Sequence, residues 1–376
     1  MLNAEKTKTV DCINTRPLAV KALALAVAAA VWLSAAAGCA VKETIAETTA
    51  APTTAPATTE PAPPGMMNPL TGLYGMNEEA QGKRPVAVVI NNAPDARPQW
   101  GLCSPDIVVE SLAEGGITRM LWLYADAATI PKKIGSIRSA RHDFVEIAEG
   151  LDAVFVHWGG SGYAYDALKS RDVDRIDGMY SDKYFFRDNT RSGGREHRGC
   201  TTGQKLTAAL DELGLRTAIK EQYAAPFAFC EEDNMVAPAN ACSRVSFAFS
   251  QSYRHEFRFV KENKLYYNYL NGNPMVQDGG EQMAVRNLIL LYCGVKPLGG
   301  GLVDMDLSQG AGIFVSNGGY EDITWAKGGP SDSLALYGAD GKALKLNPGK
   351  SYIALIPTAQ KAKTVFAGEE STTAVY

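Results

Sequence analysis

The chain has 376 residues, of which 46% are hydrophobic and 21% are charged, and its formal net charge is -4. This composition is that of an ordinary globular protein, and the length is sufficient for two domains. The weak negative charge gives no electrostatic case for a nucleic-acid partner, which a clustered basic surface would provide.

The first 39 residues have the layout of an export signal. Arg16 and Lys21 precede an apolar, alanine-rich run over 22–37, which is short for a membrane span. Small residues stand directly before Cys39, as in a bacterial lipobox, although Ala36 stands where such boxes favour leucine. We therefore predict a signal peptide and a lipoprotein that is attached through Cys39 to the outer face of the cell membrane.

The next segment, 40–69, is dominated by Thr, Ala, Pro and Glu and offers almost nothing to bury. Such a segment cannot offset the entropy lost when its backbone is ordered. We predict a disordered tether between the lipid and a folded body.

The densest mixture of hydrophobic and charged residues lies within 106–160. A glycine pair at 115–116 separates two β-rich runs and suits a two-residue hairpin turn. That turn predicts a register in which Glu110, Glu114 and Arg119 share one side of the hairpin, and the opposite side is the core surface. The charged side is then either a ligand site or a solvated strand face with a surface ion pair.

Apolar residues recur at helical spacing over 137–151, and Gly150 is a suitable end, so we predict a helix that begins near Ser139. Arg138 and Arg141 would then lie on its first turn, where the helix dipole disfavours cations unless an anion is close. That anion would be either a phosphate or carboxylate of a ligand, or the carboxylates of the hairpin.

A continuous apolar run over 86–90 predicts a strand that is buried on both faces of an α/β sheet. Asn91, Asn92 and Arg97 follow at its carboxyl end, where open α/β sheets usually bind their ligands. The same residues also suit a plain turn, because the sequence Asn-Asn-Ala-Pro favours one.

A second buried strand is predicted over 153–157, and it ends in His157. A Gly-Gly-Ser-Gly loop and a short helical pattern follow, which completes a βαβ-like order. The loop lacks the Walker lysine and the dinucleotide fingerprint, so we expect no cofactor. Ser161 lacks the nucleophile-elbow pattern, and the four histidines lack ligand-type spacing, so we expect neither a serine nucleophile nor a metal.

Short β-type runs separated by Asn-Gly and Asp-Gly turns dominate the second half of the chain. We therefore predict a mixed fold of the α/β or α+β class. An α/β domain over 70–225, with a βαβ-like core, would precede a smaller β-rich domain over 240–368. The β-type runs cover 254–260, 264–270, 287–292, 312–315, 322–326, 334–337 and 352–356.

Several short motifs occur together from Asn68 onward. They include Asn68-Pro69-Leu70-Thr71-Gly72, Ala96-Arg97-Pro98-Gln99, Glu114-Gly-Gly-Ile-Thr-Arg119, Ile134-Gly-Ser-Ile-Arg138-Ser139-Ala140-Arg141, His157-Trp-Gly-Gly-Ser161 and Asn317-Gly-Gly-Tyr-Glu-Asp. In this combination the chain resembles the YerB-like bacterial lipoproteins, whose two-part body is classed as a domain of unknown function. The resemblance implies an envelope location and no established activity or ligand.

From these observations we expect a binding or assembly factor at the cell envelope that recognises an anionic or polar ligand, such as cell-wall material. The alternative is an enzyme that acts on cell-wall material with Glu110 or Glu114 as acid or base. A catalytic carboxylate should lie in a cleft with a raised pKa, whereas a neutralised one stays ionised. The candidate ligand-binding residues are Asn91, Asn92, Arg97, Glu110, Glu114, Arg119, Arg138, Ser139, Arg141 and His157.

Overall fold

The computed structural model describes residues 65–171 and 173–368. Cys39, the predicted signal peptide and most of the predicted tether lie outside these residues. The ordered body begins before the predicted end of the tether at residue 69, because β1 (Met66–Met67) pairs with β2 (Tyr74–Met76). Within the described part of the chain, no helix has the length and apolar character needed to cross a membrane.

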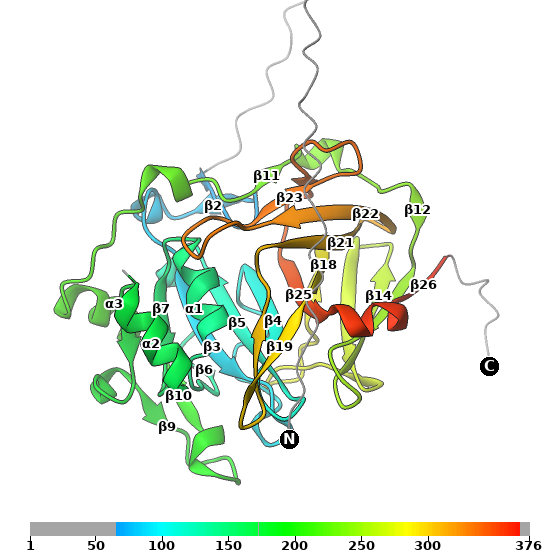
Figure 1. Ribbon diagram of the computed structural model, residues 1–376. Helices are drawn as coiled ribbons and strands as arrows, with labels where there is room; N and C mark the ends of the chain where they lie inside the picture. The colour runs from blue at the N-terminus through cyan, green and yellow to red at the C-terminus, as the bar shows by residue number, and fades with distance from the viewer. Residues whose placement is uncertain (1–64, 172, 369–376) are drawn as a thin grey trace, which may run out of the picture. The chain divides into compact units, whose positions relative to one another are not determined.

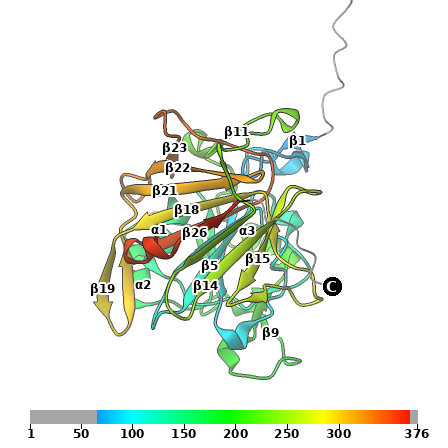
Figure 2. The same cartoon turned by 90° about the vertical axis from the view of Figure 1, so that its right-hand side faces the viewer.

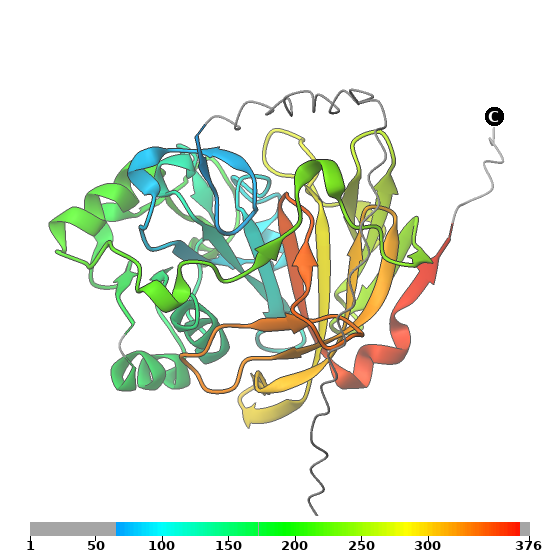
Figure 3. The same cartoon turned by 90° about the horizontal axis from the view of Figure 1, so that it is seen from above.

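The described residues form a central sheet of eleven strands in the order β12-β22-β21-β18-β25-β4-β5-β3-β7-β8, with β23 paired to β22. Its middle is the parallel pair of β4 and β25, in which Val109 faces Ile353. The view from above shows the orange-red β25 beside the cyan strands of the first half (Figure 3). The two ranges predicted as separate domains are thus joined by main-chain hydrogen bonds through one sheet.

The strands of this sheet are β3 (Val86–Asn91), β4 (Ile107–Leu112), β5 (Thr118–Tyr124), β7 (Val154–His157), β8 (Arg175–Asp177), β12 (Asn240–Ala241), β18 (Asn287–Cys293), β21 (Gln309–Ser316), β22 (Gly319–Ala326), β23 (Ala335–Tyr337) and β25 (Ser351–Pro357). Every residue of β3, β5, β7, β18 and β25 is buried, because both faces of the sheet are covered. The strands predicted over 86–90 and 153–157 are therefore confirmed as β3 and β7.

Two helices cover one face of the sheet. Phe144 and Ala148 of α1 (His142–Glu149) and Ala164 of α2 (Gly162–Ser170) pack in the same apolar cluster as Leu121 and Phe155 of the sheet. Both helices lie in front of β3 and β7 (Figure 1). The predicted strand–helix–strand order corresponds to β3, α1 and β7, of which β3 and β7 pair in parallel. The parallel strands β7 and β8 flank α2 and form a further βαβ unit, which was not predicted.

The opposite face is covered by α3 (Gly203–Glu212) and by a second sheet in the order β16-β15-β14-β13-β26, with β17 paired to β15. Burial alternates along β15, as expected for a strand with one covered face. Figure 2 shows β14 and β15 side by side on this flank. The strands are β13 (Arg244–Ala248), β14 (Arg254–Val260), β15 (Leu265–Leu270), β16 (Asn273–Pro274), β17 (Ala284–Val285) and β26 (Val365–Ala367).

Smaller elements complete the body. A three-stranded sheet has the order β6-β10-β9, β11 pairs with β24, and β19 pairs with β20 in an arm that we call the β19–β20 arm. Their bounds are β6 (Ile134–Gly135), β9 (Phe186–Arg187), β10 (Gly199–Thr201), β11 (Ala228–Phe229), β19 (Val295–Gly299), β20 (Leu302–Met305) and β24 (Lys345–Leu346). The short 3-10 helices cover 78–80, 94–96, 127–129, 182–184, 195–197, 221–223, 232–234 and 358–363.

The predicted register of the first hairpin is wrong by one residue. The turn contains three residues, since the amide of Ala113 donates to the carbonyl of Ile117 at 2.9 Å. Glu110 consequently pairs with Met120, and Arg119 pairs with Ser111. Because a shift of one residue reverses the face of every side chain, Glu110 and Arg119 lie on opposite faces of the sheet.

The predicted start of the first helix is also wrong, whereas its end at Gly150 is confirmed. The helix begins at His142, and Arg141 before it is extended, with φ -125° and ψ 145°. Residues 137–140 are extended too, because the amide of Arg138 donates to Val89 at 3.0 Å. Arg138 therefore does not lie on the first turn of a helix.

Candidate functional site

The structure divides most of the predicted site residues among three places. Glu110 is the centre of a buried polar cluster, which we call the Glu110 cluster. Glu114 holds two arginines in a second group, which we call the Glu114 cluster. Arg138 and Ser139 line a hollow on the surface, which we call the Arg138 hollow. Each of these places has a different chemical capacity.

In the Glu110 cluster every contact of the carboxylate is internal. Oε1 accepts hydrogen bonds from Thr118 Oγ1 at 2.6 Å and from Asn92 Nδ2 at 3.1 Å, and it lies 3.2 Å from His255 Nε2. Oε2 accepts a hydrogen bond from the hydroxyl of Tyr352 at 2.7 Å. The partners come from β5, from the segment after β3, and from β14 and β25, so the cluster ties the two sheets together.

The electrostatics of this cluster favour an ionised carboxylate. Burial raises the pKa of Glu110, but His255 and the hydrogen bonds from Thr118 and Tyr352 outweigh it, so the net shift is downward. Burial, together with Glu110, raises the pKa of Tyr352 well above its usual value. The ring of His255 stacks on Phe247 with centroids 5.6 Å apart. Glu110 has 0% exposure, so its carboxylate is closed off from solvent.

The three residues predicted after β3 do not form one site. Asn92 belongs to the Glu110 cluster, where its Oδ1 accepts a hydrogen bond from Gln99 Nε2 at 3.0 Å. The neighbouring Asn91 turns the other way, and its Nδ2 lies 3.0 Å from His197 Nδ1. The guanidinium of Arg97 lies 5.8 Å from the centre of the Tyr253 ring. Successive side chains of an extended backbone point to opposite faces, which explains why the side chains of the two consecutive asparagines point in opposite directions.

In the Glu114 cluster one carboxylate is shared by two arginines. Arg119 forms an ion pair with Oε1, and Arg141 Nη2 lies 2.5 Å from Oε2. Each arginine also donates to a main-chain carbonyl: Arg119 Nη1 donates to Ser139 at 2.8 Å, and Arg141 Nη1 donates to Ala140 at 2.7 Å. Burial, and then the nearby Arg141, lowers the pKa of Arg119. The cluster is therefore an internal network with one excess positive charge.

The Arg138 hollow has a volume of about 330 Å³ and lies beyond the carboxyl ends of β7 and β8. This is the edge at which open α/β sheets usually bind ligands. Among the described residues, the side chain of Arg138 has no hydrogen-bond or ion-pair partner, although its main chain is fixed on both sides. The hollow is lined by Ile137, Arg138, Ser139, Trp158, Gly159, Gly160, Tyr165, Met179, Arg187 and Glu196.

A second arginine faces the same hollow. The guanidinium of Arg187 lies 4.1 Å from the centre of the Trp158 ring and also donates to the carbonyl of Arg195. Burial lowers its pKa, and the nearby arginines, including Arg138, act in the same direction. Glu196 is the carboxylate of the lining. Two guanidinium groups against one carboxylate give the hollow a positive character.

Hydrogen bonds connect the residues of the wall beneath the hollow. His157 is fully buried, and its Nδ1 lies 2.8 Å from the carbonyl of Gly159. Asp177 Oδ1 accepts the amides of Gly159 at 3.0 Å and Met179 at 2.9 Å, while Tyr165 donates to Oδ2 at 2.8 Å. Burial lowers the pKa of His157, although Asp177 opposes it. His157 thus supports the hollow from behind and does not line it.

Sequence reasoning missed Arg187, Trp158 and Asp177 as parts of this site. The residues follow or belong to different strands, and no spacing along the chain links them. The one available signal was the polar character of each strand end, which is weak. It also missed a group of potential metal ligands, His142, Asp143 and Asp304, whose donor atoms lie within 4.8 Å of one another.

Residues 70–216 match the family model described as "Protein of unknown function (DUF3048) N-terminal domain", and residues 245–353 match the corresponding C-terminal domain. The chain belongs to the DUF3048 family. It is also 31% identical over 294 residues to "Putative lipoprotein YerB" of Bacillus subtilis (strain 168), across 77% of this chain and 86% of that protein. The resemblance inferred from the motifs is therefore confirmed.

The crystal structure of the YerB protein from Bacillus subtilis has a similar fold. It superposes with a TM-score of 0.68 at 27% sequence identity, and the match covers 80% of this chain and 99% of that one. The shared architecture thus includes both of the DUF3048 parts. The name of this relative describes a lipoprotein and assigns no activity to it.

Proposed function

We propose that this protein is a lipid-anchored lipoprotein on the outer face of the cell membrane, and that its body binds an anionic group of an envelope ligand in the Arg138 hollow. The export-signal layout and Cys39 support the anchor, and so does the relative that is named as a lipoprotein. The body would act as a binding or assembly factor with no cofactor.

The observation that carries the proposal is the contrast between neighbouring arginines. Arg119 and Arg141 both pair with Glu114 and both donate to main-chain carbonyls. Arg138, three residues before Arg141, has no such side-chain partner among the described residues. A guanidinium offers five N–H donors in a planar fork, which suits a carboxylate or phosphate. The unused donors of Arg138 are available to a ligand.

The rest of the hollow suits the same chemistry. Arg187 supplies a second cation, and Trp158 beneath it supplies a flat apolar surface. A volume of about 330 Å³ is at the lower end of the range for small-molecule sites. The ligand class is therefore a carboxylate or phosphate carried on a small unit, such as one sugar or amino-acid residue of the cell wall.

Catalysis by Glu110 or Glu114 has less support. Glu110 has no exposure, and the net shift of its pKa is downward, whereas an accessible carboxylate with a raised pKa is expected of a general acid. Both carboxylate oxygens of Glu114 are already occupied by arginines.

The test is a binding titration of the full-length chain, purified in mild detergent, with inorganic phosphate and with soluble muropeptides. Arg138→Ala should weaken the binding of the preferred probe at least about tenfold, because a charge-assisted hydrogen bond contributes about 1.5–3 kcal/mol. Arg187→Ala should weaken it as well. Arg254→Ala, which removes an exposed guanidinium on β14, is the matched control and should bind as the parent does. Equal binding by Arg138→Ala and Arg254→Ala would refute the proposal.

A further inference from the structure

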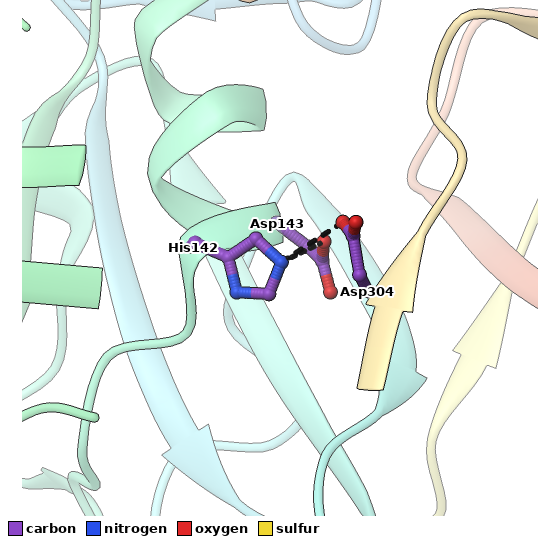
Figure 4. A group of neighbouring side chains, drawn as sticks. All are labelled: His142, Asp143 and Asp304. Carbon is purple, nitrogen blue, oxygen red and sulfur yellow. Dashed lines mark hydrogen bonds and ion pairs between the residues drawn. The ribbon is translucent and has the colours of Figure 1, made fainter. Parts of the chain in front are cut away.

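A second group of side chains converges at the start of α1, apart from the Arg138 hollow. His142 Nε2 lies 3.1 Å from Asp143 Oδ1 and 3.0 Å from Asp304 Oδ1. Figure 4 shows the imidazole nitrogen directed toward both carboxylates. His142 and Asp143 begin α1, whereas Asp304 comes from β20 of the β19–β20 arm. The tertiary fold therefore assembles these three donors.

The charges around this group are unbalanced. Asp143 is only 3% exposed, and its contacts within the described residues are His142 and the amide of Met305, which donates to it at 3.2 Å. No lysine or arginine of the described residues forms an ion pair with Asp143. A buried carboxylate without a cation is costly, so this site has an electrostatic demand for positive charge.

We propose that His142, Asp143 and Asp304 bind a divalent transition-metal cation of the Zn²⁺ or Mn²⁺ class. One imidazole nitrogen and two carboxylate oxygens form a mixed donor set, which such cations accept. Neighbouring ligands of a tetrahedral ion with bonds of about 2.0–2.1 Å lie roughly 3.3 Å apart. The distances of 3.1 Å and 3.0 Å from His142 Nε2 to the two carboxylates are close to this value, and the two carboxylate donors lie within 4.8 Å of each other. Ca²⁺ is disfavoured because it requires about 6–8 oxygen ligands.

The site opens to solvent on one side. The side chain of Asp304 is 42% exposed and that of His142 is 18% exposed, while Asp143 forms the closed end. Three protein ligands with an open fourth position leave room for water or for an anionic group. The bound cation would therefore also be accessible to a small ligand.

A cation here fastens the β19–β20 arm to the first half of the body. The arm is otherwise attached through few polar contacts, among which Tyr163 donates to Leu298 at 3.1 Å and Gly115 donates to Gly301 at 3.2 Å. The ligands come from the ranges of both DUF3048 parts. Metal binding would thus join the two parts at a second place besides the shared sheet.

The test uses the full-length chain in mild detergent after treatment with EDTA. Titration with Zn²⁺ and Mn²⁺ should show one site per chain, and Ca²⁺ should bind more weakly. Asp304→Asn should reduce the affinity for Zn²⁺ by about tenfold or more, since even indirect partners of metal ligands contribute that much. Asp306→Asn is the matched control, because it removes the same charge two residues away, where the carboxylate accepts from Ser308 instead.

Co²⁺ in place of Zn²⁺ separates this site from adventitious binding to free cysteines such as Cys103 and Cys230. Visible bands without thiolate charge transfer, lost in Asp304→Asn and kept in Asp306→Asn, would support the proposal. Absence of binding, a thiolate spectrum, or equal affinity in the two variants would overturn it. The result is independent of the Arg138 hollow, since Arg138→Ala leaves all three ligands in place.

Discussion

The Glu110 cluster and the Arg138 hollow both contain residues that the sequence marks as candidate ligand binders, yet they differ in how their polar groups are satisfied. Glu110 has four side-chain partners and no exposure. The side chain of Arg138 forms no hydrogen bond or ion pair with the described residues, although the Glu196 carboxylate of the same lining attracts it, and it lines an open hollow. A charge that is fully paired inside the fold has no capacity left for a ligand, whereas an unpaired charge at a hollow retains it.

The Glu114 cluster lies between these extremes. Its carboxylate is 29% exposed but is occupied by two arginines, one of which is almost completely buried. Counting partners therefore ranks the three places from structural to ligand-binding. The ranking predicts that a substitution in the Glu110 cluster lowers the free energy of unfolding most, one in the Glu114 cluster less, and one at Arg138 least. Each prediction below tests this order.

Glu110→Gln should have the largest effect on stability. The amide keeps the size of the side chain but removes the charge. Its NH2 group, which donates and does not accept, must also replace one of the two buried oxygens that accept from Tyr352 on one side and from Thr118 and Asn92 on the other. Breaking a buried, hydrogen-bonded charge pair costs about 3–5 kcal/mol. A urea melt of the full-length chain measures the loss. Glu256→Gln on β14, where the carboxylate pairs with Arg258 near the surface, is the control and should cost at most about 1 kcal/mol. Similar losses in both variants would contradict the structural role of Glu110.

Arg141→Ala should have the next largest effect. It removes the ion pair with Glu114 and the hydrogen bond to Ala140, but solvent can reach the carboxylate that remains. We expect a loss of about 1–3 kcal/mol in the free energy of unfolding, as for an unsatisfied, partly buried group. Arg141→Lys keeps the positive charge but loses the planar set of guanidinium donors, so it should recover only part of the lost stability. Full recovery by lysine would mean that charge alone matters at this position.

The pH dependence of stability should reveal the charge on Glu110. Its pKa in the folded protein lies below the ordinary value of a glutamate, because His255 and the hydrogen bonds stabilise the ionised form, so the unfolded chain binds the proton more readily. The stabilisation is therefore fully present above about pH 4.5 and is lost as the pH falls through the pKa of the folded protein. The loss amounts to about 1.4 kcal/mol for each pH unit that separates the folded pKa from the unfolded one. His255 and Tyr352 face the carboxylate. Tyr352→Phe removes one hydrogen bond that lowers the pKa of Glu110, so the pH range over which stability is lost should become narrower. A difference between the parent and Glu110→Gln that stays constant from pH 7 to pH 3 would argue against an ionised Glu110.

Much of the fold could be predicted from the sequence, because its signals are local. Continuous apolar runs located β3 and β7, and the β-type runs of the second half located β14, β15, β18, β21, β22, β23 and β25. The joining of both halves in one sheet could not be predicted in this way. Val109 and Ile353 are paired in adjacent strands although they are far apart in the sequence, and no local pattern in either strand specifies its neighbour.

The candidate site was harder to predict for the same reason. One additional residue in the turn after Ala113 moved Glu110 away from Arg119, and turn length is a poor inference from a glycine pair. Hydrogen bonds to β3 keep Arg138 extended, although its surroundings have helical spacing. Arg138 and Ser139 were among the candidates predicted from the sequence, whereas Arg187 and Asp304 join the proposed sites only through tertiary contacts.

Arg138→Ala should have the smallest effect on stability, within about 0.5 kcal/mol, because the side chain makes no hydrogen bond or ion pair among the described residues. Its main-chain bonds to Val89 and Trp158 do not depend on the guanidinium and should persist. The urea melt should therefore coincide with that of the parent, even though binding of the anionic probe is lost. A loss of about 3 kcal/mol or more would place Arg138 in an internal network like that of Glu114. Unchanged stability together with lost binding is the combination that only a ligand-directed arginine produces, because removal of a structural arginine lowers both.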